Sequence, residues 1–305
     1  MSLAGIANPD LVTLADNKAR WNLPDHRRHG FHNLHTIARY TQSFRAPRVL
    51  PLRKAIDWSI GERPDVARLL AMPHFSGFVV VNGDRILYER YAPDFGPDCV
   101  HSIQSITKTT LNLMLGRVVA DGLVNLEDRV KTYLPEIGTG YAEATVKAMA
   151  DMNVANDFSE DYADPHAGSY DMELAMGWRL PEEGDTALTI RSFVCGVTGS
   201  DVKNRTGHAL YKSTNSDALG WIIERVSGKP LRHWLIEIVE AAGIEGAFHI
   251  TCDRDGVPLI DGGGVMTARD LARYGLLFAR KGKGIDGRRV GDKDFIKATR
   301  RNPGP

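Results

Sequence analysis

The chain has 305 residues, and its lysine and arginine residues balance its aspartate and glutamate residues at 38 each. A neutral chain offers no electrostatic footprint for nucleic acid or for an anionic membrane, and no apolar run approaches the roughly 18 residues of a membrane span. Apolar residues make up 43% and charged residues 25% of the chain, which is typical of a soluble globular protein with a sizeable core.

The first nine residues, Met1 to Pro9, lack a basic region followed by an apolar run. They therefore do not resemble a signal peptide. The three cysteines, Cys99, Cys195 and Cys252, are an odd number at wide spacing, which favours reduced thiols. Both features predict a cytoplasmic protein and weaken a role on cell-wall substrates.

In chain order, residues 1–70 are poorly patterned and rich in proline and basic residues, so we expect a wrapping segment with short helices. Residues 75–91 predict a hairpin, because two β-prone runs flank Asn82-Gly83, a strong type I′ turn signal. Residues 104–121 predict a buried apolar helix. Further helical patterns occur at 126–133, 145–152, 187–195, 215–226, 231–241, 267–281 and 292–299.

Ser105 and Lys108 stand three residues apart at the start of the apolar helix. Positions i and i+3 share a helix face, so the lysine can be held against the serine hydroxyl and activate it as a nucleophile. The helix N-terminus adds free N–H groups for an oxyanion. A chain of this length contains about one such spacing by chance, and Ser200-Asp-Val-Lys203 is a second, in a polar loop. The alternative for Ser105 is a helix N-cap beside a solvated lysine.

Tyr211 lies in a loop just before the helical pattern at 215–226. A tyrosine beside a lysine ammonium can act as a general base, because the positive charge lowers the pKa of the phenol. Taken alone, Tyr211 is an ordinary core or surface aromatic. Taken together with Ser105 and Lys108, it becomes the candidate base.

These motifs carry a family resemblance. Ser105-x-x-Lys108 followed by Tyr211-x-Ser213-x-Asn215 resembles the penicillin-recognising serine hydrolases, in the class C β-lactamase branch with its esterases. The segment 262–273, Gly-Gly-Gly-Val-Met-Thr-Ala-Arg-Asp-Leu-Ala-Arg, is similar to a helix of that branch. Within it, segments 21–24, 158–165 and 177–179 resemble the 6-aminohexanoate-dimer hydrolases, which cleave nylon oligomers.

The resemblance runs from about residue 20 to residue 300 and implies an α/β fold of the α+β type, β-lactamase-like. An antiparallel sheet flanked by helices would be joined to a mainly helical lobe in one domain spanning 1–305. The implied sheet lobe is 1–110 with 265–305, and the implied helical lobe is 111–264.

The resemblance also implies a mechanism without a metal or cofactor. Ser105 attacks a carbonyl, Lys108 and Tyr211 manage the proton, and water releases the acyl-enzyme. The Ser105 N–H supplies half of an oxyanion hole. The expected substrates are small carboxylic esters or short linear amides. Two alternatives stay open: activity like that of a β-lactamase or DD-peptidase, and a non-catalytic binding protein that keeps Ser105 as a relic.

Five substrate-binding residues follow from the same resemblance. Tyr162 matches a tyrosine of the nylon-oligomer enzymes, whereas Glu173 stands where they have aspartate and Asp261 where they have asparagine. Both acids could equally be plain surface residues. Ser213 replaces the asparagine of the commoner Tyr-x-Asn pattern, which argues against specialisation for β-lactams, and Asn215 completes the set.

One departure from the family concerns the C-terminus. The family has a Lys-Thr-Gly or His-x-Gly strand that lines the pocket and gives the second oxyanion N–H, but this sequence stops at Pro305 before such a strand. The hairpin at 75–91 is the only clear one in the sequence. We therefore expect the C-terminal sheet strands to be missing from this chain and to come from a further segment or a second chain. A homodimer is also left open.

Two further patterns predict no additional site. His26, His29, His32 and His35 recur every three residues, but with Gly30 among them and only Asp25 as an acidic neighbour we expect surface or substrate-edge histidines rather than a metal site. The glycines at 262–264 follow no good strand and carry no Gly-Lys-Ser/Thr, so a phosphate loop is not expected.

Overall fold

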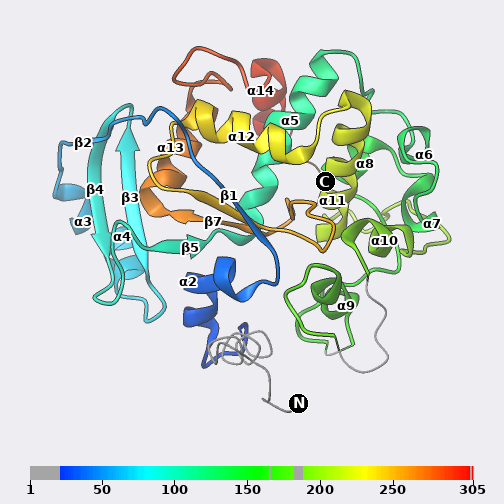
Figure 1. The fold of residues 1–305 in the computed structure, drawn as a ribbon, viewed down its shortest axis with the longest axis horizontal. Helices are drawn as coiled ribbons and strands as arrows, with labels where there is room; N and C mark the ends of the chain where they lie inside the picture. Colours follow the sequence, from blue (N-terminus) through cyan, green and yellow to red (C-terminus); the bar gives the residue numbers. More distant parts are fainter. Residues whose placement is uncertain (1–20, 165, 182–187, 303, 305) are drawn as a thin grey trace, which may run out of the picture.

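The computed structural model describes residues 21–164, 166–181, 188–302 and 304. Figure 1 shows a small sheet at one end of the molecule, a second sheet in the middle, and a group of short helices at the other end. The expected α/β architecture with antiparallel sheets and flanking helices is therefore confirmed. The interpretation of residues 1–20, and the start of the helix expected at 187, lie outside the described residues.

The small sheet contains the predicted hairpin. Its strands are β2 (Arg53–Lys54), β3 (Gly77–Asn82) and β4 (Arg85–Tyr91), in the order β2-β4-β3. Asn82 pairs with Arg85, so the loop residues are Gly83 and Asp84, one position later than predicted. Gly83 has φ +61° and Asp84 is not among the described residues with positive φ. This is the type II′ pattern, and the predicted type I′ turn is wrong.

The middle sheet was not predicted. It consists of β1 (Thr41–Phe44), β5 (Val100–Ser102), β6 (Phe248–Thr251) and β7 (Gly264–Thr267), in the order β1-β6-β7-β5 with every neighbouring pair antiparallel. The hairpin was the only strand pair that stood out in the sequence, so these four strands add to the predicted elements. The expected loss of C-terminal strands is not confirmed. β6 also lies inside the range 111–264 that we expected to be helical.

The long helices match the sequence prediction closely. They are α5 (Thr109–Ala120), α11 (Ser213–Ser227), α12 (Leu231–Ala242), α13 (Ala268–Ala279) and α14 (Lys293–Arg301). The remaining helices are α2 (Arg27–Ile37), α3 (Ser59–Glu62), α4 (Pro64–Leu70), the 3₁₀ turn η1 (Gln104–Lys108), α6 (Val130–Tyr133), α7 (Thr139–Ala142), α8 (Val146–Ala150), α9 (Gly168–Ala175) and α10 (Ile190–Cys195). The helix expected at 126–133 is reduced to α6, and α7 and α9 were not predicted. Helices α2, α3 and α4 lie within residues 1–70, where short helices were expected. None of the described helices combines the length and apolarity that a membrane span requires.

Helix α11 runs through the core beside α5 (Figure 1). Every residue from Ser213 to Ile223 is buried, including several polar ones. Its partner α5 buries Leu111, Leu113 and Met114 among others. The packing of these two helices brings the residues before α11 next to η1, where the predicted nucleophile lies.

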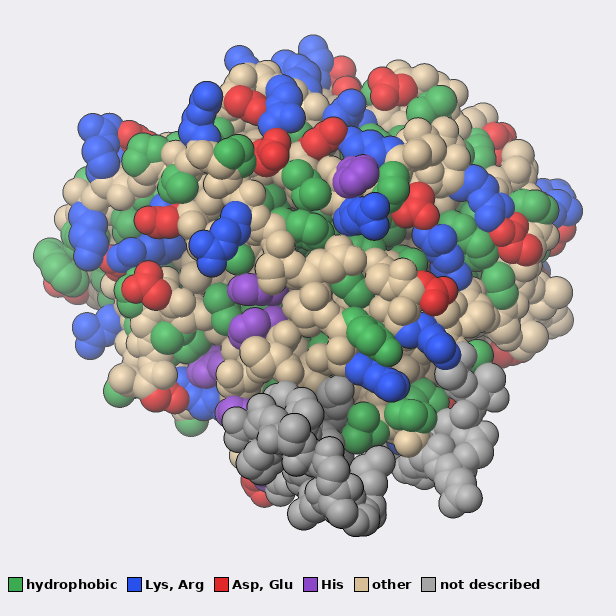
Figure 2. Space-filling view, in the orientation of Figure 1, with side chains coloured by type: hydrophobic (Ala, Val, Ile, Leu, Met, Phe, Trp, Pro, Cys, Tyr) green, Lys and Arg blue, Asp and Glu red, His purple; other side chains and the backbone are tan. Residues whose placement is uncertain are grey.

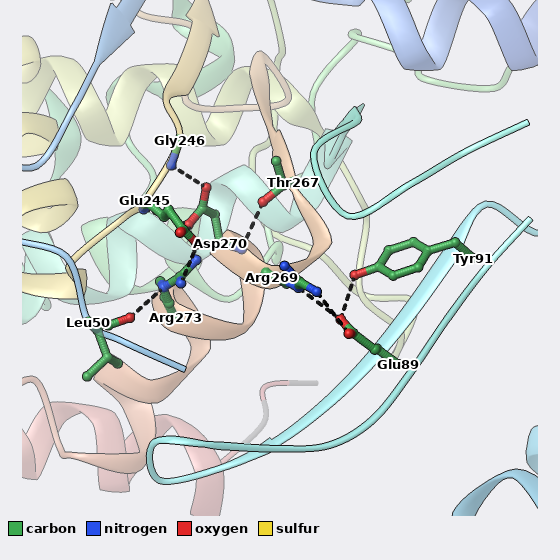
Figure 3. Close-up of polar contacts among 9 residues, drawn as sticks. All are labelled: Leu50, Glu89, Tyr91, Glu245, Gly246, Thr267, Arg269, Asp270 and Arg273. Carbon is green, nitrogen blue, oxygen red and sulfur yellow. Dashed lines mark hydrogen bonds and ion pairs between the residues drawn. The ribbon is translucent and has the colours of Figure 1, made fainter. Parts of the chain in front are cut away.

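The Thr-Ala-Arg-Asp-Leu segment docks helix α13 onto the rest of the fold (Figure 3). The Thr267 hydroxyl caps the helix by accepting the Asp270 N–H at 3.1 Å. The Asp270 carboxylate accepts the backbone N–H groups of residues 245 and 246 at 2.8 and 3.0 Å. The Arg273 guanidinium donates to Asp270 at 2.8 Å and to the Leu50 carbonyl at 2.9 Å. This buried ion pair is satisfied on both sides and fixes α13 beside the sheet.

A second contact ties the same helix to the hairpin. Arg269 donates two hydrogen bonds of 2.8 Å to the Glu89 carboxylate on β4, a bidentate geometry that is strong for this pair. Tyr91 donates to the same carboxylate at 3.1 Å (Figure 3). These hydrogen bonds, those from Arg269 above all, lower the pKa of Glu89. The Thr-Ala-Arg-Asp-Leu segment therefore connects the small sheet with the middle sheet.

Candidate active site

The predicted nucleophile lies on a 3₁₀ turn and not on the expected α-helix. The turn η1 leads directly into α5. In a 3₁₀ helix, side chains at i and i+3 eclipse one another, so Lys108 lies directly beside Ser105, with 3.1 Å between Nζ and Oγ. The residue before the nucleophile, Gln104, has φ +42°. Such a backbone conformation costs energy in a non-glycine residue and tends to occur at functional sites.

Tertiary contacts hold this strained turn. The Gln104 N–H and its side-chain amide both donate to the Ser102 hydroxyl, at 3.3 and 2.6 Å. Ile103 donates its N–H to the Gly264 carbonyl at 2.9 Å, and Gly264 donates its own N–H to the Thr107 hydroxyl at 3.0 Å. Gly264 of strand β7 therefore hydrogen-bonds to the chain on both sides of Ser105.

Three predicted catalytic side chains meet at one oxygen atom. Tyr211 donates its hydroxyl hydrogen to Ser105 Oγ at 2.6 Å, and Lys108 Nζ approaches the same atom at 3.1 Å. Lys108 Nζ also lies 5.1 Å from the centre of the Tyr211 ring. Ser105 and Tyr211 are exposed, so a substrate can reach them. The convergence of an amine and a phenol on an accessible serine is the arrangement that activates a nucleophile.

The Lys108 ammonium group is fixed by two further oxygen atoms. It donates to the Ser213 hydroxyl at 2.9 Å and to the backbone carbonyl of Asp261. Ser213 was expected to contact substrate, but the structure places its buried side chain against Lys108 instead. The Ser213 hydroxyl therefore contributes to the fixed position of the Lys108 ammonium group.

The Ser105 N–H lies at the open end of the turn. The first backbone hydrogen bond of η1 runs from Ile106 N–H to the Ile103 carbonyl, and the first N–H groups of a helix lack an intrahelical acceptor. The Ser105 N–H can therefore receive an oxyanion. The wall beside it includes Gly262, where an added Cβ would lie 3.5 Å from Trp178 and 3.8 Å from Gln104 Oε1.

The other expected substrate-binding residues are distributed differently. Tyr162 is 62% exposed and donates to the Glu160 carboxylate at 2.7 Å. Asn215 is fully buried, accepts from Tyr141 at 2.9 Å and donates to the Met149 carbonyl at 3.2 Å. Asn215 therefore serves the packing of α11, and the structure does not bring it to Ser105.

Two predicted acidic residues have raised pKa values. Burial raises the pKa of Asp261 to about 6, although Lys108 opposes this shift. Burial also raises the pKa of Asp217, a neighbour missed from the sequence, well above its usual range, and Asp261 adds to that shift. Burial likewise raises the pKa of Glu173, on α9, to about 7. Neither Glu173 nor Asp261 is an ordinary surface acid, because both carboxyl groups are largely withdrawn from water.

Two charged residues beside the site were also missed. Glu160 binds Ser213 and Tyr162, and Lys212 donates to the backbone carbonyls of Asn156 and Phe158. Both lie within segments that carry the family resemblance, and only spatial proximity distinguishes them from their neighbours in the sequence.

The repeated histidines lie on or beside α2, on a face where Figure 2 shows histidine side chains gathered together. The His35 ring stacks on His249 with 4.6 Å between centroids, and the His32 ring packs on His101 at 5.0 Å. These are ring contacts between helix and sheet. In the described part of the chain, no group of three or more His, Cys, Asp or Glu residues could hold a metal ion.

An open 3₁₀ turn with Ser-x-x-Lys, an opposing tyrosine and an antiparallel sheet behind them define the β-lactamase-like class of proteins. Comparison with protein families agrees, and the chain belongs to the β-lactamase family, whose model matches residues 65–304. Among relatives, a 6-aminohexanoate-dimer hydrolase from Paenarthrobacter ureafaciens is 32% identical over 232 residues, which is 74% of this chain. The match spans 57% of that relative's length.

Solved structures share the fold. A Bacillus anthracis protein provisionally named 6-aminohexanoate-dimer hydrolase superposes with a TM-score of 0.78 over 92% of this chain and 75% of its own, at 19% identity. EstCE1, described as a hydrolase with promiscuous acyltransferase activity, gives a TM-score of 0.54 over 78% of this chain and 77% of its own, at 14% identity. At such identities the similarity establishes the fold alone.

Proposed function

We propose that this protein is a serine hydrolase that forms an acyl-enzyme on Ser105 and cleaves carboxylic esters or short linear amides. The observation that carries the proposal is the convergence of Lys108 Nζ and Tyr211 OH on Ser105 Oγ, at 3.1 and 2.6 Å. The relative that cleaves a 6-aminohexanoate dimer supports the substrate class. The pKa of the nearby Asp261 carboxyl is raised, and perturbed pKa values of this kind are common at active sites.

In the proposed reaction, Tyr211 acts as the phenolate, having first given its proton to solvent, and Ser105 Oγ attacks the substrate carbonyl carbon while the serine proton passes to the phenolate oxygen. The Lys108 ammonium stabilises the negative charge on that tyrosine when it acts as the base. The Ser105 N–H donates to the oxyanion of the tetrahedral intermediate. Tyr211 then gives the proton to the departing alcohol or amine as the bond to it breaks. A water molecule attacks the acyl carbon, and its proton returns through Tyr211 to Ser105.

The same proposal places the enzyme in the cytoplasm. All three cysteines are free in the structure, and reduced thiols fit a reducing compartment. Fractionation of the native organism with an antibody to the protein tests this assignment.

The decisive test is intact mass spectrometry after treatment with a fluorophosphonate probe. We expect one covalent adduct on the wild-type protein and none on Ser105→Ala. Ser200→Ala is the matched control, because it removes the serine of the other Ser-x-x-Lys sequence and should leave the adduct unchanged. Tyr211→Phe should slow adduct formation by about 100-fold or more, because the proton acceptor is lost.

Substrate class is tested with a p-nitrophenyl ester, a linear amide of 6-aminohexanoate and a chromogenic cephalosporin. We expect turnover of the ester or the amide, lost in Ser105→Ala. Turnover of the cephalosporin alone would support a β-lactamase instead. An unreactive Ser105 would overturn the proposal and leave a non-catalytic binding protein.

A further inference from the structure

The Glu160 carboxylate connects the lysine of the site with the exposed Tyr162. Its Oε1 atom accepts the Ser213 hydroxyl at 2.8 Å and the Tyr162 hydroxyl at 2.7 Å. Its Oε2 atom accepts the Ser213 N–H at 2.6 Å. Ser213 Oγ in turn accepts from Lys108 Nζ at 2.9 Å. A continuous hydrogen-bond chain therefore runs from Ser105 through Lys108, Ser213 and Glu160 to Tyr162.

The direction of each hydrogen bond in this chain follows from the groups present. A serine hydroxyl has one hydrogen and two lone pairs, and an ionised carboxylate only accepts. Because Ser213 gives its single hydrogen to Glu160, its lone pairs must face Lys108. Glu160 thereby sets Ser213 as an acceptor for the ammonium group. If that hydrogen pointed at Lys108 instead, two donors would face each other and the lysine would be displaced from Ser105.

The same carboxylate also fixes the corner that carries the general base. Ser213 is the first residue of α11. The N-cap residue before it, Lys212, makes no capping hydrogen bond with its side chain. Glu160 supplies a carboxylate there, where the helix dipole favours negative charge. In return, Lys212 reaches back to the carbonyls of Asn156 and Phe158. Two sets of hydrogen bonds thus hold the loop 156–162 against the segment 211–213: those from Ser213 to Glu160, and those from Lys212 to the loop carbonyls.

We propose that Glu160 is a positioning residue, which holds Lys108 in register with Ser105 through the Ser213 hydroxyl and connects the exposed Tyr162 to the same network. This inference rests on the proposed hydrolase function. It goes beyond that function by assigning a role to a residue outside the Ser105, Lys108 and Tyr211 set. Its effect passes through Ser213, so the two residues should act as one unit.

The test is a double-mutant cycle in the full chain, measured as the second-order rate of fluorophosphonate labelling. Glu160→Gln has nearly the same shape, but its amide nitrogen donates and cannot accept. We expect it to slow labelling by about 10- to 100-fold, because small displacements of catalytic groups have effects of this size. In a Ser213→Ala background, the same change should slow labelling by less than about threefold, because the link is already broken. Asp161→Asn is the matched control, and it should label like the wild type. Among the described residues, the Asp161 side chain accepts a hydrogen bond only from the nearby Ala163 N–H.

A helix cap without any catalytic effect would lower the melting temperature of Glu160→Gln and leave its labelling rate, and the pH dependence of that rate, unchanged. That result would overturn the proposal, as would strictly additive losses in the cycle. If Glu160→Gln does not fold, Glu160→Asp replaces it: this side chain keeps the charge but is too short to hold both Ser213 and Tyr162, so it should also label about tenfold more slowly. Wild-type labelling by Glu160→Asp would refute positioning.

Failure of the proposed function is recognised separately, because the wild-type protein would then not label at all. In that event, amide hydrogen exchange of Ser105→Ala with and without Glu160→Gln still tests whether Glu160 holds segments 156–162 and 211–213 together. We expect exchange of segments 156–162 and 211–213 to accelerate together when Glu160 is replaced. Unchanged exchange in either segment would overturn the inference without reference to catalysis.

Discussion

The sharpest stability prediction concerns the Glu173 carboxyl group on α9. Its pKa is raised from 4.5 to about 7, chiefly by burial, and Arg179 partly offsets the shift. Below about pH 4.5 the group is protonated in both the folded and the unfolded chain. As the pH rises, the unfolded chain loses this proton first, so the unfolded state becomes relatively more favourable until the folded group ionises near pH 7. Glu173 therefore contributes a loss of stability between about pH 4.5 and pH 7.

The magnitude follows from the shift. A difference of about 2.5 pKa units corresponds to about 3.4 kcal/mol at full effect. The Glu173 side chain keeps some contact with water, which screens the charge, so we expect about 2 kcal/mol. Glu173→Gln removes the titration without changing the shape. The free energy of unfolding of the variant, relative to wild type, should rise by that amount across this range and then stay constant.

The assay is urea unfolding of both proteins at about pH 4.5, 6 and 7.5. Glu143→Gln is the control, because Glu143 is exposed and its pKa is lowered by hydrogen bonding to Lys131. Its contribution to stability changes below about pH 4.5, so the difference between the control and wild type should stay nearly constant across the assayed range. Parallel curves for wild type and Glu173→Gln would refute the reasoning, since they would mean that Glu173 titrates equally in both states.

Three further changes test how the fold supports the site. Gly264→Ala would place a Cβ 2.6 Å from Thr107 Oγ1, so we expect a loss of about 1–3 kcal/mol in urea unfolding together with slower probe labelling. Gly275→Ala is the control: it makes the same substitution within helix α13, where nothing lies within 4 Å of the new Cβ. It should raise stability by about 0.5–1 kcal/mol, because alanine favours the helix more than glycine does. A loss of stability would contradict the open space around that position. Asp270→Asn removes the buried carboxylate partner of Arg273 and leaves only the exposed Glu245 to pair with it. We expect thermal unfolding to show a loss of about 3 kcal/mol; an unchanged stability would contradict the importance of the buried pair.

The sequence predicted the elements whose signals are long or local. Helices α5, α12 and α13 each contain 12 residues with an apolar face, which is long enough for a helical period to be recognised. The hairpin was predicted because two apolar strands flank a two-residue loop. In both cases, residues close in sequence carry the whole signal.

The middle sheet could not be predicted by the same reasoning. Its strands contain three or four residues, and β7 is buried at all four positions. A strand that short shows no alternation, and burial on both faces removes the polar positions that would mark it. β1 pairs with β6 from about 200 residues away in the sequence. Only the folded chain brings these segments together.

In the candidate site too, residues with local signals were predicted and residues that depend on distant contacts were not. Ser105 and Lys108 are three residues apart, so local geometry predicted their contact, and the family resemblance added Tyr211. Asn215 also fitted the motif, but helix α11 turns its side chain into the core, where it bonds Tyr141. Glu160 remained unnoticed because its contacts with Ser213 span 53 residues.

The strained turn shows why such distant contacts matter. Gln104 holds φ +42°, a conformation that an isolated peptide would leave at once, since it costs roughly 1–3 kcal/mol. The hydrogen bonds of β7 to Ile103 and Thr107 persist only when the whole sheet is assembled. Ser105 therefore acquires its position from the tertiary fold and not from the local Ser-x-x-Lys sequence. Ser200-x-x-Lys203 has the same spacing in an irregular loop. Because that loop, as the structure describes it, lacks the contacts with strand β7, we expect Ser105 and not Ser200 to react with the probe.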